Sequence, residues 1–245
     1  ASGPGLVGLY AGGLRPSKVV ILQEQLDYAL EIARTHDLTI DTVHLHVGRG
    51  VLTDALPAFE MAVERAVPMA ERLVAAGHPI SEVNVGGGLG VPYDTGQEPL
   101  DVHAYAEVLR RHLAPLGVTV ACEPGDFLTK DMGVLLAEVV SVDDRDGYRF
   151  VGVDAGFNVA PEHFIYEEPV SIVLSRAVDA PRGRLVTVAG NINEGDDLWG
   201  EDVVLPEPHE GDVLALLRMG SYNRSMHIDH CLRPPAGTVA FADRR

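Results

Sequence analysis

The clearest fold signal in the chain is the stretch Glu82-Val83-Asn84-Val85-Gly86-Gly87-Gly88-Leu89-Gly90, in which a short strand pattern runs directly into a glycine cluster. A long helical pattern at residues 59–76 precedes this stretch, and a second helical pattern at 102–113 follows it. A strand that ends in glycine between two helices is typical of βα units with a parallel sheet. We therefore expect residues 82–85 to form one strand of such a sheet.

The same alternation extends on both sides of this strand. Residues 42–47 and 118–121 give two more strand patterns, and residues 22–33 give an amphipathic helical pattern before the first of them. The repeat of roughly 40 residues per unit fits part of a (β/α)8 TIM-type barrel, whose active site is built from the loops that follow its strands. A segment of an α/β barrel is therefore the predicted fold here.

The pattern changes after about Val139, where short β-prone runs replace the helical period. These runs cover residues 148–153, 185–188 and 212–217, and turn signals separate them. The predicted fold class is α/β plus β. We expect residues 1–136 to form the C-terminal part of the barrel and residues 137–245 to form a mainly β, barrel-like domain.

Composition narrows the class of protein. The 245 residues are 46% hydrophobic, and 19 Lys and Arg against 36 Asp and Glu give a formal charge of -17. Proteins that bind nucleic acid or anionic membranes need a basic face, so neither is an expected partner. Cys122 and Cys231 are the only cysteines, which indicates reduced thiols in a cytoplasmic protein. The sequence shows no apolar run long enough for a membrane helix and no export signal at residues 1–5.

Two histidines in the first strand raise the question of a metal site. His44 and His46 are two residues apart, so on a strand both side chains point to the same face. A zinc hydrolase built on a barrel holds metal in this way, but it needs further ligands at later strand ends. Residues 85–88 and 121–123 contain no histidine. We therefore predict no metal, and a hydrogen-bonded structural pair remains the alternative to a binding role.

Glycines and a carboxylate follow the next two strands. The run Gly86–Gly88 lets backbone N–H groups approach a phosphate, because no Cβ intervenes, although a tight packing turn gives the same pattern. The run does not match the glycine pattern of dinucleotide sites. Glu123 comes at the end of the following strand, before Pro124 and Gly125. A lone acid there is often a loop cap, but its position beside the glycine run favours a functional role.

Seven short motifs occur in one order along the chain. They are Tyr10-Ala11-Gly12 with Arg15-Pro16-Ser17-Lys18, His44-Leu45-His46-Val47-Gly48, Gly86-Gly87-Gly88-Leu89-Gly90, Cys122-Glu123-Pro124-Gly125, Val153-Asp154-Ala155-Gly156-Phe157-Asn158, Gly190-Asn191-Ile192-Asn193-Glu194 and Gly220-Ser221-Tyr222. With these motifs the chain resembles the fold-type III decarboxylases that depend on pyridoxal 5′-phosphate (PLP), the family of diaminopimelate, ornithine and arginine decarboxylases. The resemblance implies a barrel followed by a β domain, PLP as cofactor and an amino acid as substrate.

The resemblance also implies roles for individual residues. His46 would stack on the pyridine ring of PLP, while the backbone of Gly86–Gly88 and the loop at Gly125 would hold the phosphate. Glu123 would pair with the pyridine nitrogen and keep it protonated, which makes the ring an electron sink. Tyr222 would contact the phosphate from the β domain.

Some polar positions depart from the family pattern. Asn193 and Glu194 would act in catalysis across a homodimer with shared active sites, but the family has a cysteine at Asn193 that is associated with proton delivery, and an amide cannot donate a proton in that way. Arg49 and Asp126 would lie at the cofactor. The family often has serine at the first of these positions and usually has arginine at the second, and it has arginine near Glu162.

The Schiff-base lysine of the family lies on an early barrel strand, upstream of the segments matched here. Lys18 and Lys130 are the only lysines in the chain, and neither lies in the corresponding motif. The early barrel strands are missing as well. The chain is therefore interpreted either as a fragment or as one part of a barrel that another chain completes.

The leading hypothesis is a PLP-dependent amino-acid decarboxylase, a carboxy-lyase, in its completed form. Racemase- or epimerase-type chemistry at Cα is one alternative, because Asn193 replaces the usual proton donor. A catalytically silent homologue that binds a decarboxylase partner is the other. If Asp126 and Glu162 face the substrate, a cationic or neutral distal group is expected on it; the alternative is that both are solvated loop charges.

Overall fold

The computed structural model describes residues 21–94, 96–181 and 183–242, so the motif residues Tyr10 to Lys18 lie outside the described part. The chain divides into two compact units, Ala1–Leu128 and Thr129–Arg245. A hydrophobic core lies within each of them. The predicted boundary after residue 136 falls inside strand β4 (Val134–Arg145), which pairs with strand β9 (Val213–Leu217) from its first residue onward. The second unit therefore begins earlier than expected.

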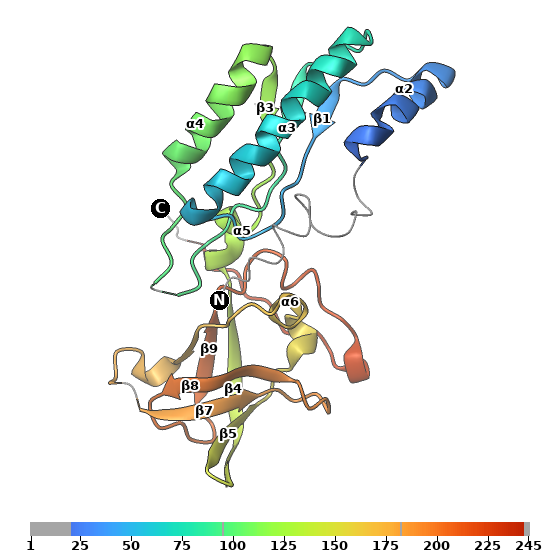
Figure 1. Cartoon of the computed structure of the whole chain (residues 1–245). Coiled ribbons are helices and arrows are strands. Elements are labelled where there is room, and N and C mark those ends of the chain that lie inside the picture. The colour runs from blue at the N-terminus through green and yellow to red at the C-terminus, as the bar shows by residue number, and fades with distance from the viewer. Residues whose placement is uncertain (1–20, 95, 182, 243–245) are drawn as a thin grey trace. The chain divides into compact units, whose positions relative to one another are not determined.

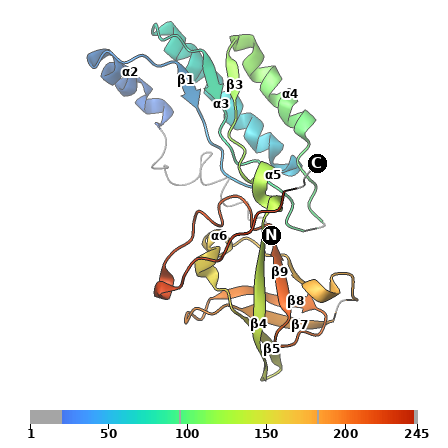
Figure 2. The same cartoon turned by 180° about the vertical axis from the view of Figure 1, so that it is seen from behind.

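The first unit is a series of βα repeats. Its three strands are parallel in the order β1-β2-β3, and Figures 1 and 2 show helices α2, α3 and α4 along one face of this sheet. Its elements are η1 Gln23–Gln25, α2 Leu26–Thr35, β1 Thr42–His44, η2 Thr53–Ala55, α3 Leu56–Ala75, β2 Glu82–Asn84, α4 Val102–Leu113, η3 Ala114–Leu116, β3 Thr119–Ala121 and the short α5 Asp126–Thr129. The predicted helices and strands of this part are all present, although β1 ends earlier than residue 47.

Apolar side chains at helical spacing pack α3 against the sheet. Phe59 and Val63 lie in the buried core together with Val83 of β2. The ring of Phe59 also packs on the ring of Tyr105 in α4, with 4.9 Å between the ring centroids. Burial of this apolar surface, at about 25 cal/mol per Å², fixes the helices on one face. The loops that follow the strands are thus left to carry polar groups.

The second unit is a curled sheet of six strands. Their order is β6-β9-β4-β5-β7-β8, and neighbouring strands are antiparallel except for β5 and β7. Strands β6 and β8, which end this order, also contact each other, so the sheet is nearly closed into a barrel. Its elements are η4 Lys130–Met132, β4 Val134–Arg145, β5 Tyr148–Val153, η5 Phe157–Val159, α6 Glu162–Tyr166, β6 Ile172–Leu174, η6 Ser175–Ala177, β7 Arg184–Ala189, β8 Leu198–Leu205, β9 Val213–Leu217 and η7 His230–Leu232.

Strands β5, β7 and β9 confirm the three predicted β runs, whereas β4, β6 and β8 were not predicted. Strand β8 contains Gly200, Glu201 and Asp202, which are residue types with low strand propensity. It forms because β7 pairs with it over most of its length and because Trp199 and Leu205 are buried in the core of this unit. Tertiary pairing therefore overrides the local preference.

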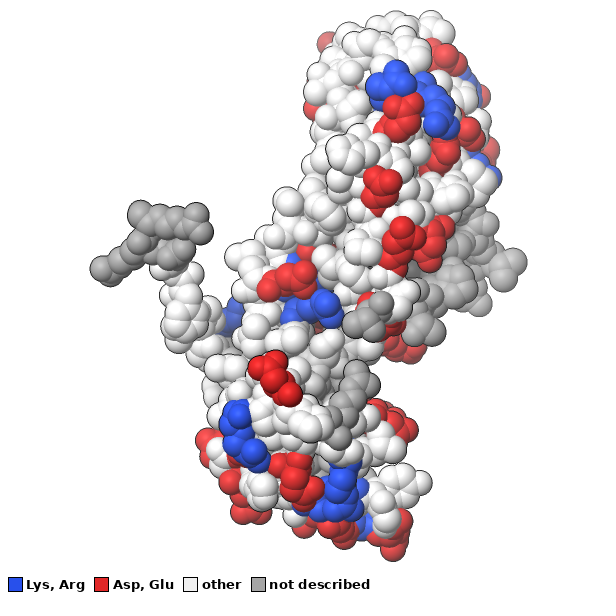
Figure 3. Space-filling view, turned by 90° about the vertical axis from the view of Figure 1, so that its left-hand side faces the viewer, with Lys and Arg blue, Asp and Glu red and all other residues white. Residues whose placement is uncertain are grey.

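Basic side chains do not form a stripe on the face drawn in Figure 3. Carboxylate side chains are spread over both units there, and the basic side chains lie among them. No helix in the described ranges is both long enough and apolar enough to span a membrane.

Candidate functional site

The carboxyl ends of the three parallel strands bring polar residues to one edge of the first unit. His44 of β1 is the ladder partner of Asn84 in β2, and Asn84 in turn is the partner of Ala121 in β3. Because parallel strands end at the same edge, the loops after them are neighbours. His46, the glycine run and Glu123 therefore come together at this edge.

The carboxylate of Glu123 is held in place from β2. The amide Nδ2 of Asn84 donates a hydrogen bond to Glu123 Oε1 at 2.7 Å, and the Asn84 Oδ1 accepts one from the N–H of Gly86 at 2.9 Å. His44 Nε2 lies 3.9 Å from the same carboxylate oxygen. The Glu123 side chain stays 57% exposed, so a positioned carboxylate faces outward and can receive a cationic group. Sequence reasoning missed Asn84, whose signal is a polar side chain directly before the glycine run.

The glycine run packs tightly between the loops on either side of it. A Cβ on Gly87 would collide with the backbone oxygen of Glu123, and a Cβ on Gly88 would collide with the backbone oxygen of Gly48. Gly86 and Gly88 also have φ angles of 71° and 88°, in the left-handed region. The tight-turn interpretation of these glycines is therefore correct. It does not exclude a phosphate, because the Gly88 N–H makes no hydrogen bond to any described residue.

We expected His44 and His46 to lie on one regular strand, but they do not. Strand β1 ends at His44, and His46 lies in the loop beyond it. There the His46 Nδ1 accepts a hydrogen bond from the N–H of Gly87 at 3.4 Å. The two rings thus contact different groups of the same edge: His44 lies near the carboxylate and His46 lies against the glycine run.

Arg49, in the loop region after β1, and Asp126, the first residue of α5, form an ion pair in the first unit. Arg49 Nη2 lies 3.9 Å from Asp126 Oδ2, and the two side chains are only 19% and 12% exposed. Gly125 precedes Asp126, and its carbonyl accepts a hydrogen bond from the N–H of Leu128 at 3.1 Å. Asp126 is therefore neither a solvated loop charge nor an unbalanced one, because a guanidinium lies beside it.

Asn193 and Glu194 lie on the exposed loop between β7 and β8 in the second unit. The buried carboxylate of Asp197 anchors this loop. It accepts hydrogen bonds from the N–H groups of Phe157 and Ile192, both at 2.7 Å. Since these two donors come from different segments, the loop is fixed at its base and presents Asn193 and Glu194 to solvent.

Residues near the C-terminal end contact that loop, and the sequence did not single them out for this role. The thiol of Cys231 donates a hydrogen bond to Asn193 Oδ1 at 2.9 Å. His230 Nε2 lies 3.2 Å from Glu194 Oε1. The one sequence signal for this contact is that Cys231 is one of only two cysteines in the chain.

Tyr222 belongs to a loop that is fixed to the start of the second unit. Ser221 Oγ lies 2.9 Å from Thr129 Oγ1, and the N–H of Gly220 donates to the carbonyl of Lys130 at 3.0 Å. Ser221 has a φ angle of 53°, in the left-handed region. Tyr222 is 48% exposed, and its contact with a phosphate stays a prediction.

Lys130 and Glu162 form a buried ion pair in the second unit. Lys130 Nζ lies 2.6 Å from Glu162 Oε2 and 3.3 Å from Glu168 Oε2. The side chains of Lys130 and Glu162 are 2% and 1% exposed. The idea that Glu162 is a solvated loop charge is therefore wrong, because the residue is buried beside a lysine.

We expect no covalent bond between PLP and a lysine of this chain. The amine of Lys130 is buried between two carboxylates, so the PLP aldehyde cannot reach it, and Lys18 lies outside the described residues and not in the motif that carries the Schiff-base lysine. Borohydride reduction with PLP, followed by peptide mapping, measures this. A stoichiometric pyridoxyl label on Lys18 or Lys130 would contradict the expectation, and a sample without borohydride is the control.

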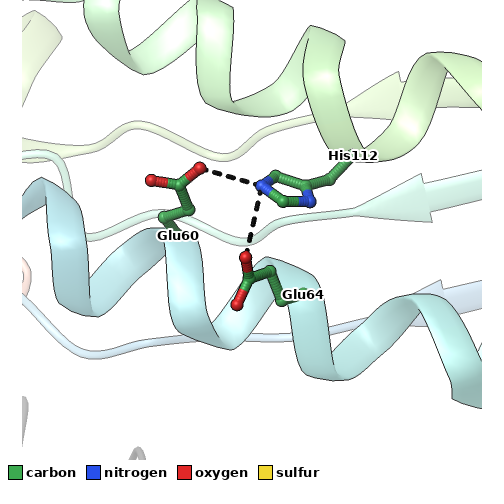
Figure 4. A group of neighbouring side chains, drawn as sticks. All are labelled: Glu60, Glu64 and His112. Carbon is green, nitrogen blue, oxygen red and sulfur yellow. Dashed lines mark hydrogen bonds and ion pairs between the residues drawn. The ribbon is translucent and has the colours of Figure 1, made fainter.

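A separate group of side chains joins helices α3 and α4 and has the composition of a metal site. Glu60, Glu64 and His112 point toward one another in Figure 4, with His112 Nε2 at 2.9 Å from Glu60 Oε1 and 3.8 Å from Glu64 Oε1. Arg111 also binds Glu60 Oε1, at 2.7 Å, and these contacts lower the pKa of Glu60, the hydrogen bond from His112 most of all. Because a guanidinium already contacts that oxygen, the group is an ion-pair network between two helices.

The fold and this site define a class of protein, and family models identify it. A model described as "Pyridoxal-dependent decarboxylase, pyridoxal binding domain" matches residues 11–130, and one described as "Pyridoxal-dependent decarboxylase, C-terminal sheet domain" matches residues 127–220. The chain therefore belongs to the pyridoxal-dependent decarboxylase family, whose cofactor is the predicted one. The predicted fold, a barrel segment followed by a sheet domain, is confirmed as well.

Individual relatives are diaminopimelate decarboxylases. That of Methanothermobacter thermautotrophicus is 37% identical over 207 residues, which are 80% of this chain and 47% of that protein. That of Helicobacter pylori is 30% identical over 237 residues, which are 95% of this chain and 57% of that protein. The chain thus spans about half the length of the curated relatives it matches.

Solved structures agree with this assignment. Diaminopimelate decarboxylase from Helicobacter pylori, complexed with L-lysine, has a TM-score of 0.76 at 29% identity and covers 86% of this chain and 52% of its own. The arginine decarboxylase of Paramecium bursaria Chlorella virus has the same TM-score at 22% identity, covers 86% of this chain and 57% of its own, and shows the shared fold.

Proposed function

We propose that the completed enzyme, meaning this chain together with the segment that supplies the remaining barrel strands, is a PLP-dependent amino-acid decarboxylase. The observation that carries the proposal is the Glu123 carboxylate at the end of β3, held by Asn84 next to the glycine run. When bound, PLP supplies an electron sink for the electrons that remain on the substrate when carbon dioxide leaves.

The residues of the first unit suit this cofactor. Glu123 offers an outward-facing carboxylate that would pair with the pyridinium N–H, and a close opposite charge would raise the pKa of the ring nitrogen. His46 offers a flat ring for stacking. The Gly88 N–H and the loop at Gly125 would hold the phosphate, and Arg49 is a cation within the same set of loops.

In the second unit, Asn193 and Glu194 are exposed on an anchored loop, as a group that serves another subunit must be. We propose that the enzyme is a homodimer whose active sites are shared in this way, with Tyr222 contacting the phosphate. A cytoplasmic location is supported by the two free cysteines, Cys122 and Cys231.

The sequence predicted a cationic or neutral distal group on the substrate because Asp126 and Glu162 are acidic. The structure removes the reason for this prediction. Asp126 has Arg49 beside it and Glu162 has Lys130 beside it, so neither acid presents an uncompensated negative charge to a substrate. The two residues therefore do not distinguish a cationic distal group from an anionic one.

Carbon dioxide release from a panel of amino acids tests the proposed function. The completed enzyme with PLP is incubated with ornithine, lysine, arginine and meso-diaminopimelate, and we expect release from at least one of them. Exchange of the Cα hydrogen with solvent deuterium, without carbon dioxide release, would instead support racemase-type chemistry. Bound PLP with neither reaction would support the catalytically silent homologue.

A further inference from the structure

The loop that carries Asn193 and Glu194 lacks an obvious proton donor at its family position. Loss of carbon dioxide from an amino acid leaves an electron pair on Cα, and a proton must be delivered to it. Asn193 cannot deliver that proton, because an amide N–H does not act as an acid near neutral pH. A decarboxylase built on this loop therefore needs an acid other than residue 193.

A thiol lies directly against this amide. Cys231 Sγ is 2.9 Å from Asn193 Oδ1, and the preceding residue, His230, is 3.2 Å from Glu194 Oε1. Two consecutive residues of η7 thus contact two consecutive residues of the loop. The ring of Phe157 packs against His230 with 5.1 Å between ring centroids, which helps to hold the segment in place.

The backbone of Cys231 is held in an uncommon conformation. Its φ and ψ angles are 53° and 25°, in the left-handed region that favours glycine, and Leu232 follows with a φ angle of 54°. A residue with a side chain keeps such a conformation only when its surroundings impose it, and such residues cluster at functional sites. Cys231 is also exposed, so its thiol can exchange protons with water.

We propose that Cys231 is the proton donor of the Asn193–Glu194 loop and takes the place of the cysteine that the family carries at position 193. The inference rests on the proposed decarboxylase function. The S–H bond breaks, its proton forms a C–H bond with the electron pair on Cα, and the pair of the S–H bond stays on sulfur. The resulting thiolate then takes a proton from water. Asn193 acts as a positioning residue, since its amide oxygen accepts the thiol hydrogen bond.

A cross-link measures the geometry without any turnover. In the variant Asn193→Cys the new Sγ would lie near the present position of Asn193 Cγ, one bond short of the oxygen that Cys231 now contacts and within reach of Cys231 for a disulfide. We expect mild oxidation to join the peptides that contain positions 193 and 231, as read by mass spectrometry, and to leave Cys122 free as the internal control. Absence of the link, or a link to Cys122 instead, would overturn the placement of Cys231.

Turnover of the completed enzyme measures the chemistry. We expect Cys231→Gly to lower kcat by about 10²-fold or more with KM nearly unchanged, because general acids contribute this much. Glycine suits the positive φ angle, so the variant folds. The matched control Cys122→Ser keeps wild-type turnover, and Asn193→Cys added to Cys231→Gly restores part of the loss by returning a thiol to the loop.

The two experiments separate the inference from the function on which it rests. Wild-type kcat in Cys231→Gly would overturn the role of the thiol while leaving the decarboxylase intact. Failure of the wild-type enzyme to release carbon dioxide from any amino acid would overturn the proposed function, and the catalytic role of Cys231 with it, whatever the cross-link shows.

Discussion

Replacing Glu123 by glutamine in the completed enzyme is expected to lower kcat by about 10²–10³-fold, the range seen when one preorganised electrostatic group is removed. The amide keeps the shape of the side chain and can still interact with Asn84. It cannot keep the pyridine nitrogen protonated, because it carries no negative charge. Groups other than Glu123 would hold the phosphate, so PLP should remain bound. The unprotonated ring would be a weaker electron sink.

Carbon dioxide release and the absorbance of bound PLP measure the two parts of this result separately. Glu82→Gln is the matched control, because Glu82 begins the strand β2 and so lies at the opposite end of the sheet from Glu123. Turnover near that of the wild type in Glu123→Gln would reduce Glu123 to a loop residue. Loss of PLP together with activity would show that the carboxylate serves binding instead.

The second large effect is on stability. Lys130→Met is expected to destabilise the second unit by about 3–5 kcal/mol, because it leaves the buried carboxylate of Glu162 without its cation. The cost of burying an unpaired charge exceeds any gain from the apolar methionine side chain. Urea unfolding of the chain, followed by the fluorescence of Trp199, the single tryptophan, measures it in the core of the same unit.

Two further variants decide whether the unpaired charge is the cause. The double variant Lys130→Met with Glu162→Leu removes both charges and should recover most of the lost stability. The exposed pair of Glu107 and Arg110 supplies the control, and Arg110→Met should leave the urea midpoint almost unchanged. Equal losses in the single and double variants would mean that packing volume, not charge, governs this position.

The family, and the elements with a strong local period, could be predicted from the sequence alone. The hydrophobic period changes from helix to strand at β1, β2 and β3, and each change is local, so α4 at residues 102–113 and β5 at 148–153 could be predicted to the residue. The motifs at His46, Gly86–Gly88 and Glu123 are contiguous runs, and parallel pairing of neighbouring strands places them at one edge.

Which polar groups contact one another depends on the tertiary fold. Asn84 and Glu123 are 39 residues apart, and Cys231 and Asn193 are 38 residues apart, so no local pattern links them. Glu162 is a charged residue that sequence alone places at the surface, yet it is buried because Lys130 meets it there. Hydrophobic periodicity is a property of neighbouring residues, whereas pairing of charges and hydrogen bonds depends on which distant segments the fold brings together. The family could therefore be predicted from the sequence, whereas the position of the Cys231 thiol beside Asn193 could not.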